Sequence, residues 1–113
     1  MTTRQLPDEY LQEIFDKLED AGKAHALAKA NLIGLSEMIK VHRRELMAIA
    51  KAHGIGSRQA QEDAAYSNPV YSKMVADLVA ATKSEKELEY ARELLKMEWD
   101  SFRTRSANSR GNR

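Results

Sequence analysis

The fold of this chain is decided by residues 11–49, whose sequence is LQEIFDKLEDAGKAHALAKANLIGLSEMIKVHRRELMAI. Twelve positions in this stretch recur at alternating spacings of three and four residues, and ten of the twelve are apolar. They are Leu11, Ile14, Leu18, Ala21, His25, Ala28, Leu32, Leu35, Ile39, His42, Leu46 and Ile49. Such spacing forms one narrow apolar stripe along a helix, and no proline interrupts it. The stretch therefore predicts one long helix that packs against a partner helix.

The partner helix is predicted at residues 70–105, where a second stripe follows the same rhythm. Its positions are Tyr71, Met74, Leu78, Ala81, Glu85, Leu88, Arg92, Leu95, Trp99 and Phe102, of which two are charged. Polar positions in such a stripe fix the alignment of two helices at some cost in stability. The two stripes together indicate an all-α fold.

Signals for helix starts and ends divide the chain. Pro7 followed by acidic residues starts the first helix, and Gly54 ends it. Ser57 caps a short helix that reaches about Tyr66. Asn68 and the proline after it begin the second long helix. We therefore expect an antiparallel two-helix hairpin resembling a coiled coil, with a short helical turn between its long helices.

The expected hairpin forms one domain over residues 1–105, followed by a basic disordered tail over residues 106–113 (SANSRGNR). With the turn near residue 60, Phe102 faces Leu18 and Trp99 faces Ala21. Gly22 and Gly34 lie inside the first helix, where glycine costs about 1 kcal/mol relative to alanine. They suggest a close approach of the partner helix or a bend.

Residues 24–35 are apolar on almost all sides of the predicted helix. Leu27, Ala30 and Ile33 lie outside the main stripe. An apolar face of this kind is typical of helices that pack against further helices, as in a four-helix bundle. We expect the chain to associate with itself as a dimer or a larger oligomer through these three residues.

The composition excludes several classes of protein. The 113 residues contain no cysteine, so disulfides and thiolate chemistry are excluded. No apolar run approaches the roughly 20 residues of a membrane span. We therefore expect a cytoplasmic protein that does not bind membranes.

Positive charge is unevenly distributed, although the net charge is only +1. From Ser101 onward the chain contains four arginines and no acidic residue, and a second basic group lies near the middle. The candidate nucleic-acid-binding residues are Arg103, Arg105, Arg110, Arg113, Lys40, Arg43, Arg44 and Lys51. Arginine keeps its charge and suits contacts to phosphates. The alternatives for Arg103 and Arg105 are that they neutralise Glu13, Asp16 and Glu19 of the first helix or that they contact a protein partner. The alternative for the middle group is that it is a solvated helix face.

No catalytic, metal or cofactor site is predicted. His25 and His42 are 17 residues apart, too far for a metal-binding pair on one helix, so we interpret them as core or interface residues. Packing that depends on their protonation is the alternative. The loop Gly54-Ile55-Gly56-Ser57 lacks the lysine of a phosphate-binding loop. We expect no enzyme activity and no cofactor.

Residues 96–110, KMEWDSFRTRSANSR, resemble the ends of small helical proteins carried by tailed bacteriophages and prophages. Those proteins close their second helix with a tryptophan followed by spaced arginines, and some are encoded near recombination or replication genes. Asp100 stands where that family often has an arginine. The resemblance implies a phage accessory protein in the host cytoplasm. We expect it to bind DNA or RNA; the alternative is an adaptor or inhibitor that docks on a host or phage enzyme by helix packing.

Overall fold

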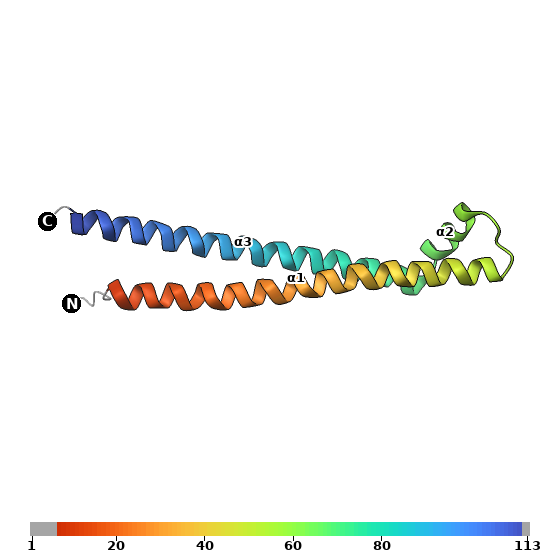
Figure 1. The fold of residues 1–113 in the computed structure, drawn as a ribbon, viewed down its shortest axis with the longest axis horizontal. Helices are drawn as coiled ribbons and strands as arrows, with labels where there is room; N and C mark the ends of the chain where they lie inside the picture. The colour runs from red at the N-terminus through yellow and green to blue at the C-terminus, as the bar shows by residue number, and fades with distance from the viewer. Residues whose placement is uncertain (1–6, 112–113) are drawn as a thin grey trace. The chain divides into compact units, whose positions relative to one another are not determined.

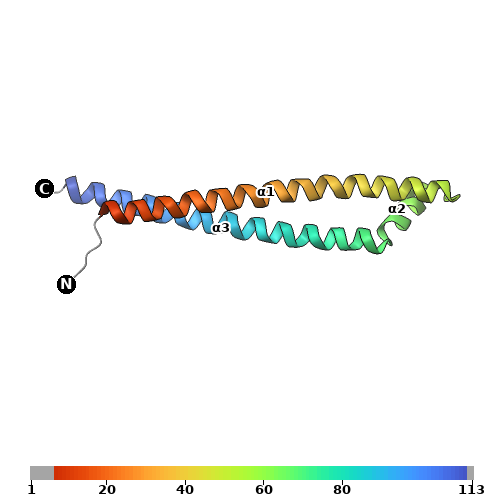
Figure 2. The same cartoon turned by 90° about the horizontal axis from the view of Figure 1, so that it is seen from below.

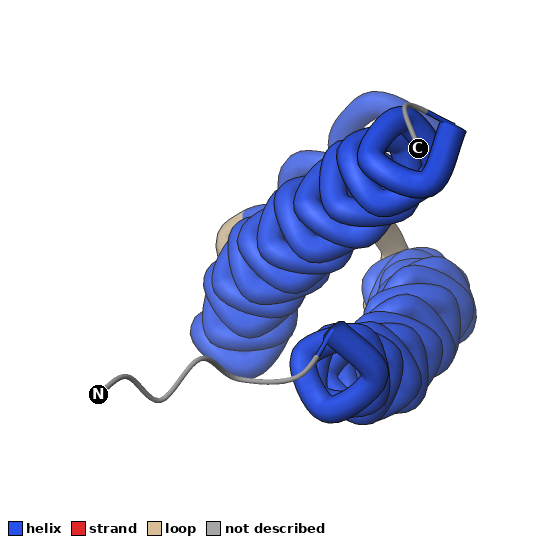
Figure 3. Tube along the Cα trace, turned by 90° about the vertical axis from the view of Figure 1, so that its left-hand side faces the viewer, coloured by secondary structure: helices blue, strands red, loops and turns tan. Residues whose placement is uncertain are grey.

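A computed structural model describes residues 7–111, and side-chain surroundings are described for most of these (Figure 1). Helix α1 covers Pro7–Ala52, α2 covers Arg58–Tyr66 and α3 covers Pro69–Gly111. Helices and short loops make up the whole described range, with no strand in it (Figure 3). The all-α prediction is confirmed, with two long helices that pack against each other.

The helices begin and end for the local reasons that the sequence predicts. Gly54 has a φ of 95°, a left-handed conformation that glycine adopts without steric cost, and it ends α1. The Ser57 hydroxyl accepts a 3.1 Å hydrogen bond from the backbone N–H of Ala60 at the start of α2. The Asn68 side chain accepts one of 2.9 Å from the N–H of Val70 at the start of α3.

Contacts divide the chain into two compact units. Unit 1 comprises Met1–Leu27 and Lys86–Arg113, and unit 2 comprises Ala28–Glu85. Each unit therefore contains a part of α1 and a part of α3. Whether the two behave as the single domain expected over residues 1–105 stays a prediction.

In unit 1 the beginning of α1 and the end of α3 lie side by side (Figures 1 and 2). The ring centroids of Tyr10 and Phe102 are 4.7 Å apart, and those of Phe15 and Trp99 are 6.2 Å apart. Rising residue numbers on α1 meet falling numbers on α3, so these two segments run in opposite directions. Ile14 is the most buried of the described side chains here, at 2% exposure.

In unit 2, α2 packs near the start of α3. Ala65 of α2 is fully buried, and the ring of Tyr66 lies 5.6 Å from that of Tyr71. The Gln61 side chain donates a 2.8 Å hydrogen bond to the carbonyl of Ile55. The bond ties the loop before α2 to that helix.

The predicted stripes coincide closely with the buried positions. On α1, eleven of the twelve are buried or half-buried; the exception is Ile49, which is 55% exposed, while Ala50 is 7% exposed. A straight helix drifts about 20° per seven residues against a strict seven-residue repeat, and over more than five repeats this reaches about the 100° of one residue. This drift explains why the buried position near the end of α1 is occupied by Ala50 and not by Ile49. On α3 only Arg92 among the ten positions is exposed.

The structure differs from three detailed predictions. First, α3 continues past Arg105 to Gly111, so the expected disordered tail is helical as far as Gly111, and residues 112–113 lie outside the described range. Extending an existing helix avoids the cost of nucleation, and no proline stops it. Second, a Cβ atom placed on Gly22 or Gly34 would meet no described atom within 4 Å, so neither glycine marks a close approach between the described segments, and the alternative, a bend at these positions, stays a prediction.

Third, the pairing of helices in unit 1 is shifted. Phe102 packs on Tyr10, about two turns before Leu18, and the ring partner of Trp99 is Phe15. The predicted pairing depended on a turn placed near residue 60. A turn that contains its own helix does not fix the alignment of the two long helices, which is why the pairing could not be predicted from the position of the turn.

Candidate nucleic-acid interface

The end of α3 presents Arg103 and Arg105, both exposed. Because successive residues of a helix are about 100° apart, these two side chains leave α3 on nearly opposite sides. They therefore do not form the single mobile cluster that a disordered tail would allow.

The acidic residues predicted to neutralise these arginines have partners on their own helix. Glu13 pairs with Lys17 at 3.4 Å, and Glu19 pairs with Lys23 at 3.2 Å. Asp16 accepts a hydrogen bond of 2.8 Å from the Gln12 side chain.

Among the described residues, neither Arg103 nor Arg105 forms an ion pair. The charge of Arg105 does act on Tyr10. The pKa of Tyr10 is raised, chiefly because its hydroxyl donates a hydrogen bond to Glu98, and Arg105 partly offsets that rise. Both guanidinium groups are therefore available to an external anion.

Arg103 belongs to a longer row on α3, which we call the Trp99 stripe: Arg92, Lys96, Trp99 and Arg103. Their spacings of four, three and four residues place them on one face of the helix. Lys96 is exposed and has no ion-pair partner within the part of the chain that the structure describes. Arg92 and Lys96 were not among the binding residues predicted from the sequence, although their spacing from Trp99 and Arg103 is visible in it.

The Trp99 stripe borders a hollow of about 460 Å³, which we call the Trp99 hollow. It is lined by Phe15, Leu18, Glu19 and Gly22 of α1 and by Arg92, Lys96 and Trp99 of α3. The side chain of Phe15 is 49% exposed, so an aromatic surface is open to solvent here. A smaller hollow of about 220 Å³ also adjoins Phe15 and Trp99.

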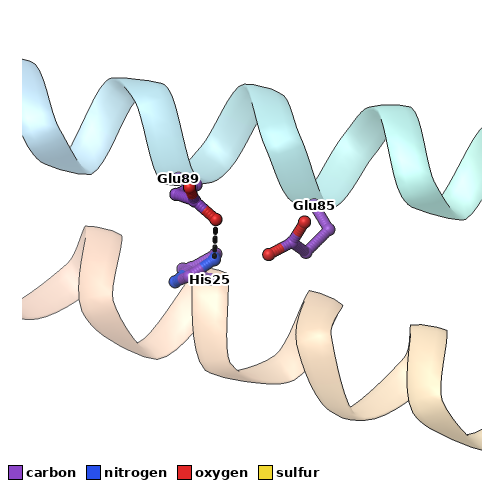
Figure 4. A group of neighbouring side chains, drawn as sticks. All are labelled: His25, Glu85 and Glu89. Atoms are coloured by element: carbon purple, nitrogen blue, oxygen red, sulfur yellow. Dashed lines mark ion pairs between the residues drawn. The ribbon is translucent and has the colours of Figure 1, made fainter.

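His25 lies between Glu89 and Arg92. Its Nε2 lies 3.8 Å from Oε2 of Glu89 (Figure 4). Its Nδ1 lies 3.4 Å from Nη1 of Arg92. Because a guanidinium only donates hydrogen bonds, Nδ1 of His25 is the acceptor in its contact with Arg92. The ring is 8% exposed, so His25 is buried, as its interpretation as a core residue expects, and the alternative that packing depends on its protonation stays a prediction. Glu85, one turn before Glu89 on α3, is 4% exposed.

The second basic group lies in unit 2. Lys40, Arg44 and Lys51 are exposed, and their spacings of four and seven residues place them on one face of α1. Lys40 pairs with Glu37 at 3.2 Å. Arg43 is half-buried. Within the described residues Arg43 and Arg44 form no ion pair. Of the four candidates in this group, Lys40, Arg44 and Lys51 therefore share an exposed face of α1, and Arg43 is set apart by its partial burial.

The remaining predicted residues are placed in part. Arg110 lies in α3 but its side chain is not described, and Arg113 lies outside the described range. Leu27 is 74% exposed and Ile33 56% exposed, and Ala30 is exposed as well. These three residues are open in the single chain.

Comparison with protein-family models, with curated proteins and with solved structures found no match. The phage resemblance therefore stays a prediction. Between residues 7 and 111, no helix has the length and apolar character required to cross a membrane.

Proposed function

We propose that this chain is a non-enzymatic nucleic-acid-binding protein that acts as an accessory factor in phage recombination or replication, in the cytoplasm of the host. The observation that supports the proposal is that two arginines near the end of α3 are exposed to solvent and form no ion pair with the described residues. Arg103 and Arg105 are exposed and without ion pairs among the described residues, while Glu13 and Glu19 are paired within α1. Unpaired cations on a helix are the usual contacts to a phosphate backbone.

The basic face of unit 2 would give a second set of phosphate contacts. Arg44 and Lys51 are exposed on the same side of α1. In the proposed assembly, the long helices form a coiled-coil-like hairpin that associates with itself, and each copy adds its own basic faces. Several weak phosphate contacts acting together strengthen binding without any new type of contact.

The test is a titration of a fluorescent oligonucleotide with the full chain at about 50 and 200 mM salt. We expect binding that weakens strongly with salt. Changing both Arg103 and Arg105 to Gln should weaken it further and make the slope of log affinity against log salt shallower, by about 0.7 to 0.9 per lost phosphate contact.

The matched control changes Lys17 and Lys23 to Gln. It removes the same charge from the same unit, but these lysines are already paired with Glu13 and Glu19. We expect a smaller loss of affinity and an unchanged salt slope. Absence of binding at low salt would overturn the proposed function.

A second candidate function is a protein-binding adaptor, and one feature of unit 2 favours it. A groove of about 460 Å³ is lined by Met38 and Val41 of α1 and by Val70 and Met74 of α3, with charged or polar residues at Glu37, His42 and Glu45. Val70 is 57% exposed and Met38 58% exposed. Methionine-rich grooves accept the apolar face of a partner helix. Stoichiometric capture of one host or phage enzyme, together with no oligonucleotide binding, would favour the adaptor.

A further inference from the structure

We infer that the Trp99 hollow receives an unpaired base of a single-stranded nucleic acid, with the cations of the Trp99 stripe on the adjoining phosphates. This inference depends on the proposed function and specifies its ligand. It starts from a juxtaposition in unit 1: an open aromatic surface made by two helices, bordered on α3 by a row of cations.

The aromatic surface consists of Phe15 on α1 and Trp99 on α3. Their centroids are 6.2 Å apart and their planes are tilted by 55°, so the rings form adjoining sides of the hollow. Leu18 and Gly22 complete the apolar lining. A base can stack on such a surface whatever its identity, because every base has a π face.

The cations extend along α3 beside this surface. From Arg92 to Arg103 is about 16 Å at 1.5 Å per residue, and Lys96 and Trp99 lie between them. A strand that follows this row would place its backbone on the basic side chains and turn a base toward Trp99. Glu19 is the one acidic residue among the described residues that line the hollow, and its carboxylate is paired with Lys23 at 3.2 Å.

Arg92 is positioned by a buried partner. His25 contacts the Arg92 guanidinium through Nδ1 and faces Glu89 through Nε2. A side chain held before binding loses less conformational freedom when it meets a phosphate. His25 is therefore a positioning residue for the site.

The geometry favours a single strand over a duplex. Bases of a duplex are stacked on their neighbours, so their faces are not open to a protein ring unless a base is flipped out at a cost of a few kcal/mol. Unstacked bases of a single strand can lie on aromatic side chains directly. The inference therefore predicts that DNA and RNA single strands bind more tightly than the corresponding duplexes.

The sole tryptophan of the chain is Trp99, so its intrinsic fluorescence reports on the hollow directly. The experiment titrates the full chain with a short oligothymidine, its oligouridine equivalent, the matched duplex, and an abasic strand of equal length and charge. We expect the two base-bearing single strands to quench the fluorescence and to bind at least about fivefold more tightly than the abasic strand.

Variants of the aromatic residues give the second measurement. Trp99→Leu should lose about fivefold or more in affinity for oligothymidine and none for the abasic strand, as followed by a labelled oligonucleotide. Trp99→Phe retains a ring and should recover part of the affinity. Tyr90→Leu is the matched control, since Tyr90 is 67% exposed on α3 and does not line the hollow.

The outcomes separate the inference from the proposed function. If no strand binds at low salt, the proposed function fails and the inference fails with it. If strands bind but the abasic strand binds equally well, or if duplex and single strand both leave the fluorescence unchanged, the proposed function stands and the inference about the hollow is overturned. The abasic comparison needs no variant, so it decides the question even if Trp99→Leu does not fold.

Discussion

The hydroxyl of Tyr10 donates a 2.8 Å hydrogen bond to the carboxylate of Glu98, a residue 88 positions further along the chain. The bond joins the first turns of α1 to the last part of α3 in unit 1. It raises the pKa of Tyr10 above its ordinary value near 10, with burial and the charge of Glu98 acting in the same direction. A raised folded-state pKa means that the bond stabilises the fold below about pH 10 and is lost as the pH rises through the raised pKa.

The first prediction follows from this bond. We expect Glu98→Gln to lower the pKa of Tyr10, because the charged acceptor is removed while the opposing charge of Arg105 remains. An NMR titration of carbon-labelled tyrosine, assigned with a Tyr10→Phe variant, measures the shift. If Glu98→Gln left the titration of Tyr10 unchanged, the result would contradict the hydrogen bond between Tyr10 and Glu98.

The second prediction concerns the core of unit 1. Ile14 is 2% exposed, and Ile14→Ala should lower the free energy of unfolding by about 2 to 5 kcal/mol, because it removes buried apolar groups and leaves a cavity. Met97→Ala is the control, since Met97 is 65% exposed, and it should change stability by less than about 0.5 kcal/mol. Urea unfolding followed by circular dichroism compares the two. Equal effects would place Ile14 outside the core.

The predictions from sequence succeed where a local rule or a repeating pattern decides the structure. The stripe on α1 identifies the buried face because each of its positions repeats the same geometric relation, and Asn68 and Gly54 start and end helices through their own side-chain and backbone chemistry. The prediction that Ile49 is buried fails because a small angular error accumulates over a long helix.

The candidate site is predicted less well, because it depends on which residues of two distant segments meet. Arg103 was predicted as a candidate, but Arg92 and Lys96 become candidates only because they line a hollow together with Phe15 of α1. The link from Glu89 through His25 to Arg92 has no pattern in the sequence, since it depends on the alignment of α1 with α3.

The third prediction tests self-association. Leu27 and Ile33 are large apolar side chains exposed in the single chain, so replacing either with Asp should cost the isolated chain little. In an oligomer the same charge would be buried, and we expect Leu27→Asp or Ile33→Asp to shift dimers or larger species toward monomers. Sedimentation equilibrium measures the change. Val79→Asp, at an exposed position of α3, is the control and should leave the association unchanged.

A wild-type chain that remains monomeric at high concentration would show that these exposed residues have another role. The same measurement on Val79→Asp guards against a general effect of added charge. If that variant dissociated the oligomer while the α1 variants did not, the interface would lie on α3.

The fourth prediction separates two neighbouring glycines. Gly54 has a φ of 95°, in which a side chain is strained, so Gly54→Ala should destabilise the fold by about 1 to 2 kcal/mol. Gly56 lies two residues later and has no positive φ, and a Cβ atom added there would meet no described atom within 4 Å, so Gly56→Ala should be nearly neutral. Thermal unfolding of the two variants under the same conditions tests this. Similar losses for both would show that the loop is strained elsewhere.

The fifth prediction has the opposite sign. Gly34 lies inside α1 with open space around the position of a Cβ atom, so Gly34→Ala should raise the free energy of unfolding by about 0.5 to 1 kcal/mol, because alanine loses less conformational freedom in a helix. Urea unfolding at low protein concentration measures the gain in the single chain. A loss of stability there would mean that another segment approaches Gly34 closely. A gain at low concentration with weaker self-association at high concentration would place Gly34 where two copies meet, since a small residue lets helices approach each other.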